Sequence, residues 1–272
     1  MDKVFSGLEY LKQRGRAIRD QPTAGLTIAA MPLLSNNFIP LAVRQLRAEE
    51  KSESLLRIMT YRSDEVADRV AMQTCDLGFS LAATNSPDVR CVRLHCQNVF
   101  LAPKSLWKWG RTRVVSLDQL GQLPLIRHER DPAQEALDRM LLEHGVFQSS
   151  TMEASFASTI AALVALGEGA AVVDPFTALA ATQLNATVVT ANIKADLPFA
   201  FYVLLPQRRP VSTRAIAFLR TIDRLSQDNK IVLRGQFLNA VGTTDATDRS
   251  LFDLIDVLKS GNDISIKRTL RP

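Results

Sequence analysis

The sequence contains few of the residues that most often carry chemistry. Among its 272 residues it has three cysteines, Cys75, Cys91 and Cys96, and three histidines. The odd number of cysteines and the lack of a CxxC pair argue against a disulfide framework. On a strand, Cys96 would point away from Cys91 and His95, which leaves no metal-binding set. We interpret the cysteines as small buried side chains in a reducing compartment.

Long apolar stretches are also absent. No apolar run approaches the ~20 residues that a membrane-spanning helix needs, and the N-terminal segment contains no apolar signal-peptide core. These absences predict a cytoplasmic protein without a membrane partner. The composition, with 46% hydrophobic and 22% charged residues, is typical of a globular protein. The net charge of +5 suits a nucleic-acid partner without demonstrating one.

Three catalytic motifs are missing: the GxSxG nucleophile elbow, the HExxH zinc helix and the phosphate-binding GxxxxGK[ST] loop. Gly167-Glu168-Gly169 lies between a predicted helix and the next strand, whereas a dinucleotide loop must follow a strand. His128, at a predicted strand end, fits either a ligand contact or a solvated loop residue. We therefore expect no cofactor and no enzymatic activity.

The stretch Gly25–Pro40 has a pattern that suits ligand binding. A short apolar strand is predicted over residues 26–30, and Pro32 ends it. Ser35, Asn36 and Asn37 are residue types that begin helices, which predicts a helix from about Phe38. Free N–H groups and the helix dipole at such a corner favour an anion or a polar ligand group.

The same design occurs twice along the chain. The first βαβαβ unit is predicted from strands at 26–30, 55–61 and 77–82, and the second from strands at 123–128, 151–154 and 170–173. A strand at 89–101 leads out of the first unit, and a strand at 199–205 leads back. Two crossings would place the units side by side, with the carboxyl ends of their parallel strands around a cleft.

Several sequence blocks occur in a familiar order: GLTIAA, IPLAVRQLRAE, LLRIMTYRSDEVADRVAMQTCDLGFSLA, VFLAPKS, SLDQLGQLPLI, and ALVALGEGAAVVD followed by proline. From about residue 1 to residue 226, the chain resembles the effector-binding part of LysR-type transcriptional regulators. The segment TYRSDEVADRVAMQTCDLGFS is most similar to the octopine- and nopaline-responsive branch. The resemblance implies an α/β fold of two Rossmann-like subdomains with a central cleft, like the type 2 periplasmic binding proteins, preceded by part of a linker helix.

The resemblance also implies a domain organisation. Residues 1–22 would form the linker or dimerisation helix, 23–101 with 206–230 the first subdomain, and 102–205 the second. Residues 231–272 would be an atypical C-terminal extension, because family members usually end soon after the helix that matches 212–226. The sequence begins inside the linker helix, so we expect DNA contact only through a helix-turn-helix domain not present here. The expected assembly is a homodimer or homotetramer.

The family's effector contacts map onto the first loop and the cleft-facing strand ends. The matching residues are Pro32, Leu33, Leu34, Ser35, Leu81, Ala82, His128, Arg130 and Ser155. Phe201 fits either a wall of the cleft or a core position. Because Ser35 is the one hydroxyl in the first loop, we expect this corner to hold its ligand through backbone groups and shape. The expected effector is a small polar metabolite, either amino-acid-like or an organic acid.

Three functions follow from these patterns. The first is the effector-sensing and oligomerisation module of a LysR-type regulator, which controls transcription. The second is a solute-binding protein for transport, which shares the fold. The third is a small-molecule enzyme on that fold, for which Glu129 and Asp131 beside His128 are the candidate acid–base pair. These two carboxylates fit a helix-capping cluster better, so we favour the regulator.

Overall fold

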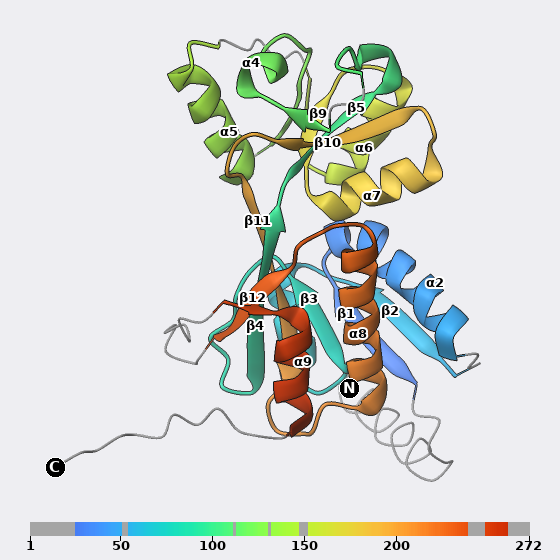
Figure 1. Ribbon diagram of the computed structural model, residues 1–272. Coiled ribbons are helices and arrows are strands. Elements are labelled where there is room, and N and C mark those ends of the chain that lie inside the picture. Colours follow the sequence, from blue (N-terminus) through green and yellow to red (C-terminus); the bar gives the residue numbers. More distant parts are fainter. Residues whose placement is uncertain are drawn as a thin grey trace, which may run out of the picture.

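The computed structural model describes residues 25–50, 54–110, 113–129, 132–146, 152–238 and 248–260, so the expected linker helix at 1–22 lies outside the described residues. Two α/β lobes are joined by two strands that cross between them (Figure 1). We call the lobe with the seven-stranded sheet lobe I and the other lobe II. In the part of the chain that the structure describes, no helix is long and apolar enough to cross a membrane.

The sheet of lobe I has the order β13-β12-β4-β11-β3-β1-β2. Its strands are β1 (Leu26–Ala30), β2 (Leu56–Thr60), β3 (Leu77–Ser80), β4 (Val89–Gln97), β11 (Pro198–Pro206), β12 (Arg234–Leu238) and β13 (Arg249–Ser250). Its helical segments are η1 (Leu34–Phe38), α2 (Ile39–Glu50), α3 (Ser63–Ala71), α8 (Thr213–Asp228) and α9 (Leu251–Ser260). β1 pairs in parallel with both β2 and β3, which confirms the first βαβαβ unit.

Lobe II contains a four-stranded sheet of order β6-β10-β5-β9 and the parallel pair β7-β8. A bridge between Leu125 and Ala170 connects them. The strands are β5 (Val99–Pro103), β6 (Val114–Val115), β7 (Ile126–His128), β8 (Met152–Ala154), β9 (Ala171–Val173) and β10 (Val188–Ile193). The helices are η2 (Lys104–Leu106), α4 (Leu117–Leu120), α5 (Pro132–Glu143), α6 (Ala157–Leu166) and α7 (Pro175–Leu184).

The crossings lie at residue 98, between β4 and β5, and at residues 194–197, between β10 and β11. The expected boundaries at 101 and 205 would divide β5 and place β11 in lobe II. Hydrogen bonding instead places the whole of β5 in lobe II and β11 in lobe I, where β11 pairs antiparallel with β4 from Pro198 to Pro206. Side chains tie the crossings together, because Asn98 Nδ2 donates to the Leu197 carbonyl at 3.0 Å.

The expected C-terminal extension contributes to lobe I. β12 extends the sheet beside β4, and α9 packs against α8. Its stripe of Leu251, Leu254, Ile255 and Leu258 is buried in the lobe I core. These residues are therefore an integral layer of lobe I rather than an appendage.

Two helical segments differ from the sequence predictions. Residues 32 and 33 are already helical, and the chain continues through the π-helical turn η1 into α2, so Ser35–Asn37 lie inside the helix instead of capping it. Proline suits the first position of a helix because it has no N–H to satisfy. α7, a helix not predicted from the sequence, begins at Pro175 with Asp174 as its N-cap.

Phe176 joins the two lobes. It belongs to α7 of lobe II, yet its side chain is fully buried within the lobe I core. Its ring centroid lies 4.1 Å from that of Phe38 and 5.7 Å from that of Phe201. Phe201 is therefore a core residue and not a wall of the cleft. Beside this cluster, Asn37 Nδ2 donates to Thr177 Oγ1 at 2.9 Å, a hydrogen bond between the lobes.

We predict that Phe176→Ala destabilises the protein by about 3–5 kcal/mol, as expected for an aromatic side chain removed from a packed core. Urea unfolding measures this change. The matched control is Phe156→Ala, since Phe156 is 56% exposed on lobe II, and its effect should stay within about 0.5 kcal/mol. Equal effects of the two substitutions would contradict the interlobe packing.

A second comparison tests whether α9 belongs to the core. Ile255 is fully buried whereas Phe252, on the same helix, is 50% exposed. Ile255→Ala should lower the free energy of unfolding by about 2–5 kcal/mol. Phe252→Ala should change it far less. If Ile255→Ala is as mild as Phe252→Ala in urea unfolding, α9 does not pack as described.

Candidate functional site

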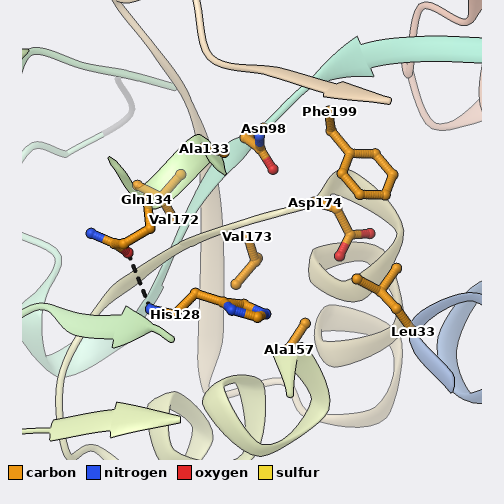
Figure 2. Close-up of a pocket in the computed structure, with 10 residues that line it drawn as sticks. All are labelled: Leu33, Asn98, His128, Ala133, Gln134, Ala157, Val172, Val173, Asp174 and Phe199. Carbon is orange, nitrogen blue, oxygen red and sulfur yellow. Dashed lines mark hydrogen bonds between the residues drawn. The ribbon is translucent and has the colours of Figure 1, made fainter. Parts of the chain in front are cut away.

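A small cavity lies where the two lobes meet (Figure 2). We call it the interlobe cavity. Leu33 comes from lobe I, Asn98 from a crossing, Phe199 from β11, and the rest from lobe II. The lining residues are Leu33, Asn98, His128, Ala133, Gln134, Ala157, Val172, Val173, Asp174 and Phe199. Its volume of about 20 Å³ has room for about one water molecule.

His128 ends β7 and directs its imidazole into the cavity, toward Ala157 (Figure 2). Its backbone N–H donates to Gln134 Oε1 at 3.2 Å, and Gln134 Nε2 donates to Asp138 Oδ1 at 2.8 Å. Its Nδ1 lies 3.1 Å from the Glu129 carbonyl oxygen. When Nδ1 donates to that oxygen, Nε2 remains available to accept a hydrogen bond. α5 thus holds the backbone of His128, and the Glu129 carbonyl orients its imidazole at the cavity.

Asp174 supplies a buried carboxyl at the same cavity. Its Oδ1 accepts the backbone N–H groups of Phe176 at 3.0 Å and of Thr177 at 2.9 Å, and its Oδ2 accepts the Thr177 hydroxyl. Burial raises the pKa of this carboxyl, although the hydrogen bonds to Thr177 and Phe176 act in the opposite direction. Asp174 therefore caps α7 and places a polar group beside Leu33 of the opposite lobe (Figure 2).

The N-terminus of α6 also meets the cavity, at Ala157. The residue before it, Phe156, is the N-cap and provides no side-chain hydrogen bond to the helix. The N-cap side chain therefore accepts none of the first N–H groups of α6. Together with the helix dipole, they favour a negatively charged ligand group near Ala157.

The first loop does not offer the backbone groups that the sequence led us to expect. Pro32 has no N–H, and the Leu33 N–H donates to Met31 Sδ at 3.1 Å. The N–H groups of Leu34 and Ser35 both donate to the Met31 carbonyl, at 3.1 and 3.0 Å. Because the helix begins at residue 32, well before the predicted start at about Phe38, the N–H groups of Leu34 and Ser35 belong to its first turn. In this arrangement the N–H groups of Leu33, Leu34 and Ser35 already have acceptors within the chain, and ligand binding at this corner stays a prediction.

Of the predicted contacts, Leu33 and His128 line the interlobe cavity, and the following do not. Leu34 is fully buried in the lobe I core. Ser35 is buried, and its Oγ accepts a hydrogen bond from Thr60 Oγ1 at 3.0 Å. Pro32 is half-buried outside the cavity lining.

The remaining predicted contacts lie elsewhere. Leu81 is half-buried and Ala82 is exposed after β3. Ser155 is exposed, and its hydroxyl donates to the Glu129 carboxylate. Arg130 and Asp131 lie outside the described residues. Whether these positions contact an effector stays a prediction.

The predicted effector contacts did not include Asn98, Gln134, Asp174 or Phe199. Asp174 was detectable, because an Asp-Pro pair is a good start for a helix as well as an end for a strand. Asn98 gave no comparable signal, since its position depends on Leu197, which lies 99 residues away in the sequence.

Among the described residues that line the cavity there is no cysteine. In the described ranges, no cluster of three or more His, Cys, Asp or Glu side chains is arranged to hold a metal ion. Burial raises the pKa of the Cys75 thiol to about 12 and that of Cys91 to about 11. Such thiols remain protonated and unreactive near neutral pH.

Two α/β lobes, two crossings of the chain and a cavity of mixed polar and apolar lining between the lobes define the periplasmic-binding-protein-like fold. Residues 19–226 match the family model of the LysR substrate binding domain, and the chain belongs to the LysR family. This confirms the resemblance and the fold expected from the sequence.

Individual relatives agree with this assignment. The chain is 26% identical to the transcriptional activator protein LysR of Escherichia coli K12, over 80% of this chain and 70% of that protein. It is 24% identical to the regulatory protein NocR of Agrobacterium tumefaciens T37, over 77% and 69% of the two chains. The fold matches full-length CbnR, solved with its target DNA, with a TM-score of 0.59, 16% identity and coverage of 82% and 77%. The relatives are transcriptional regulators, not enzymes.

The raised pKa of Asp174 predicts a pH-dependent stability. The carboxyl of Asp174 binds its proton more tightly in the folded state than in the unfolded chain. The stability that this proton contributes is complete below the ordinary pKa of 3.8 and is lost as the pH rises through the raised pKa. Asp174→Asn keeps a good N-cap but cannot ionise. The stability of Asp174→Asn relative to wild type should therefore increase from about pH 4 to about pH 8.

Urea unfolding at several pH values measures this difference. Asp174→Ala is the companion variant, because it removes the cap as well as the charge and should cost about 1 kcal/mol relative to Asp174→Asn. A difference between Asp174→Asn and wild type that shrinks or stays constant with rising pH would contradict the burial of this carboxyl.

Proposed function

We propose that this chain is the effector-sensing module of a LysR-type regulator and binds a small polar metabolite in the interlobe cavity. One observation carries the proposal. His128, Asn98 and Asp174 converge there with Leu33, which comes from the other lobe. A ligand at this point contacts both lobes, so its binding is linked to their relative position.

The small size of the interlobe cavity explains how ligand binding is linked to the relative position of the lobes. Small-molecule sites usually enclose about 300–1,000 Å³, whereas the interlobe cavity measures about 20 Å³. The lobes therefore have to move relative to each other to admit a metabolite. Phe176 and the Asn37–Thr177 hydrogen bond oppose that movement. A ligand shifts the balance only by its difference in affinity for the two arrangements, typically about 1–3 kcal/mol.

The groups around the cavity favour a carboxylate ligand, either an organic acid or an amino-acid-like metabolite. The N-terminus of α6 suits the carboxylate, and His128 Nε2 is placed to accept a hydrogen bond from a hydroxyl or N–H group of the ligand. Asp174 Oδ2 accepts one hydrogen bond, from the Thr177 hydroxyl, and a carboxylate oxygen has a second lone pair for an ammonium group. An amino acid would place its carboxylate at the N-terminus of α6 and its ammonium group at Asp174. A simple organic acid would use only the N-terminus of α6.

We place DNA contact outside these lobes, in a helix-turn-helix domain that acts with this one. The support is family membership and the fold shared with CbnR, which was solved with its target DNA. On the same grounds we propose a homodimer or homotetramer that works in the cytoplasm. Transport, the second function considered from the sequence, has no comparable support.

A thermal-shift screen with amino acids, opines and small organic acids tests this proposal. A binding compound at 100 times its Kd should stabilise the protein by about 2.7 kcal/mol and raise Tm. His128→Ala should weaken binding about tenfold or more by removing a hydrogen-bonding group. The matched control is His144→Ala, because His144 is an exposed histidine at the end of α5, outside the cavity.

Two results would count against the site. The first is a screen in which no compound of these classes raises Tm. The second is a compound whose binding is equally affected by His128→Ala and His144→Ala.

A further inference from the structure

A second, much larger cavity lies at the same hinge between the lobes. We call it the rear cavity, and its volume is about 780 Å³. α7 and β10 of lobe II form one wall, and residues 229–232 of lobe I, which follow α8, form the opposite wall. Residues 96–99 of the crossing between β4 and β5 line it as well. In Figure 1 the loop from α8 to β12 lies on the side of lobe I that faces lobe II.

The strand order separates the two cavities. β5 has β9 on one side and β10 on the other. The interlobe cavity uses Val172 and Val173 of β9, whereas the rear cavity uses residues 190–193 of β10. Asn98 is the residue common to both linings. The rear cavity is therefore a second site at the same hinge and not an extension of the first.

The walls of the rear cavity combine positive charge with apolar surface. Arg113 stands on the lobe II side, where its Nη1 donates to the Thr190 carbonyl at 3.4 Å, and Lys230 stands on the lobe I side. Leu179, Ile193 and Ile231 provide apolar surface. Of the described residues that line this cavity, none is acidic. This chemistry suits an anionic group attached to an apolar body.

Lys230 adopts a left-handed backbone conformation that favours glycine. It lies two residues after the end of α8, with a φ of 59°. The Lys230 N–H donates to the Gln227 carbonyl at 2.9 Å, and the Ile231 N–H donates to the Ser226 carbonyl at 2.8 Å. This is the Schellman arrangement, in which glycine is the favoured residue at the left-handed position. The backbone conformation at this position does not need a lysine side chain. The contribution of Lys230 is therefore an ammonium group at the rear cavity.

We propose that the rear cavity binds a small organic anion with an apolar body, such as an aryl or alkyl carboxylate. The ligand contacts α7 and β10 on one side and the loop after α8 on the other. It therefore favours the interlobe arrangement in which these walls are close together. By linkage, it modulates whatever binds in the interlobe cavity. Binding in the rear cavity is independent of the proposed function, whereas the modulation of the interlobe cavity rests on the proposed function.

Three matched probes test the binding claim by fluorine NMR on the full chain: 4-fluorophenylacetate, 2-(4-fluorophenyl)ethanol and 4-fluorophenethylamine. They share an apolar ring and differ in charge. The carboxylate should bind about tenfold more tightly than the alcohol, and the amine more weakly still. Equal affinities for the three probes would overturn the proposal.

Variants locate the bound carboxylate. Lys230→Gly should raise Tm, because it relieves the left-handed backbone, and should weaken 4-fluorophenylacetate binding about fivefold or more. Arg113→Ala should weaken it similarly. The control is Gln73→Gly, since Gln73 has a φ of 56° and lies outside the rear cavity. It should leave the affinity for the probe unchanged. Binding that survives Lys230→Gly but is lost in His128→Ala would place the probe in the interlobe cavity and overturn the assignment.

The modulation claim has a separate test. Asn37 does not line the rear cavity, but its amide ties η1 to α7. Asn37→Ala loosens the lobes and should weaken 4-fluorophenylacetate binding about twofold to threefold, because less of the protein has the walls close together. An unchanged Kd would overturn the coupling while leaving the binding site intact.

Discussion

The packing of Phe176 into the opposite lobe is the contact on which the rest of the structure depends. Its ring lies against Phe38, which the π-helical turn of η1 turns inward, and against Phe201 of β11. This cluster sets how closely α7 approaches lobe I. It therefore sets the small size of the interlobe cavity and brings Leu33 opposite Asp174. The Asn37–Thr177 hydrogen bond supports the same arrangement.

This contact also fits a sensor. Burying a phenylalanine side chain contributes about 1.5–3 kcal/mol, and coupling energies between sites are typically about 1–3 kcal/mol. The two ranges overlap, so a ligand with modest differential affinity competes with the closure of the lobes. A much larger interface would lock the lobes together. A much smaller interface would not hold the lobes in one arrangement, so there would be no defined arrangement for a ligand to shift.

The sequence predicted the two α/β units and their crossings because short apolar strands such as β1 and β3 are locally encoded. It misplaced the start of the first helix because Ser35 and Asn37 serve distant partners, Thr60 and Thr177, rather than the helix end. Leu33 and His128 were identified, whereas Asn98 and Phe199 depend on strand register between segments far apart in the chain. Local patterns contain no information on such pairings.

The distance between the lobes, measured with and without a bound effector, tests the central claim most directly. Spin labels attached through Met72→Cys and Leu166→Cys report it, because these side chains are 65% and 77% exposed in lobes I and II respectively. The native thiols Cys75, Cys91 and Cys96 are buried and should not react. The account predicts that a compound which raises Tm shifts the interlobe distance distribution. A compound that binds in the interlobe cavity and leaves this distribution unchanged would contradict it.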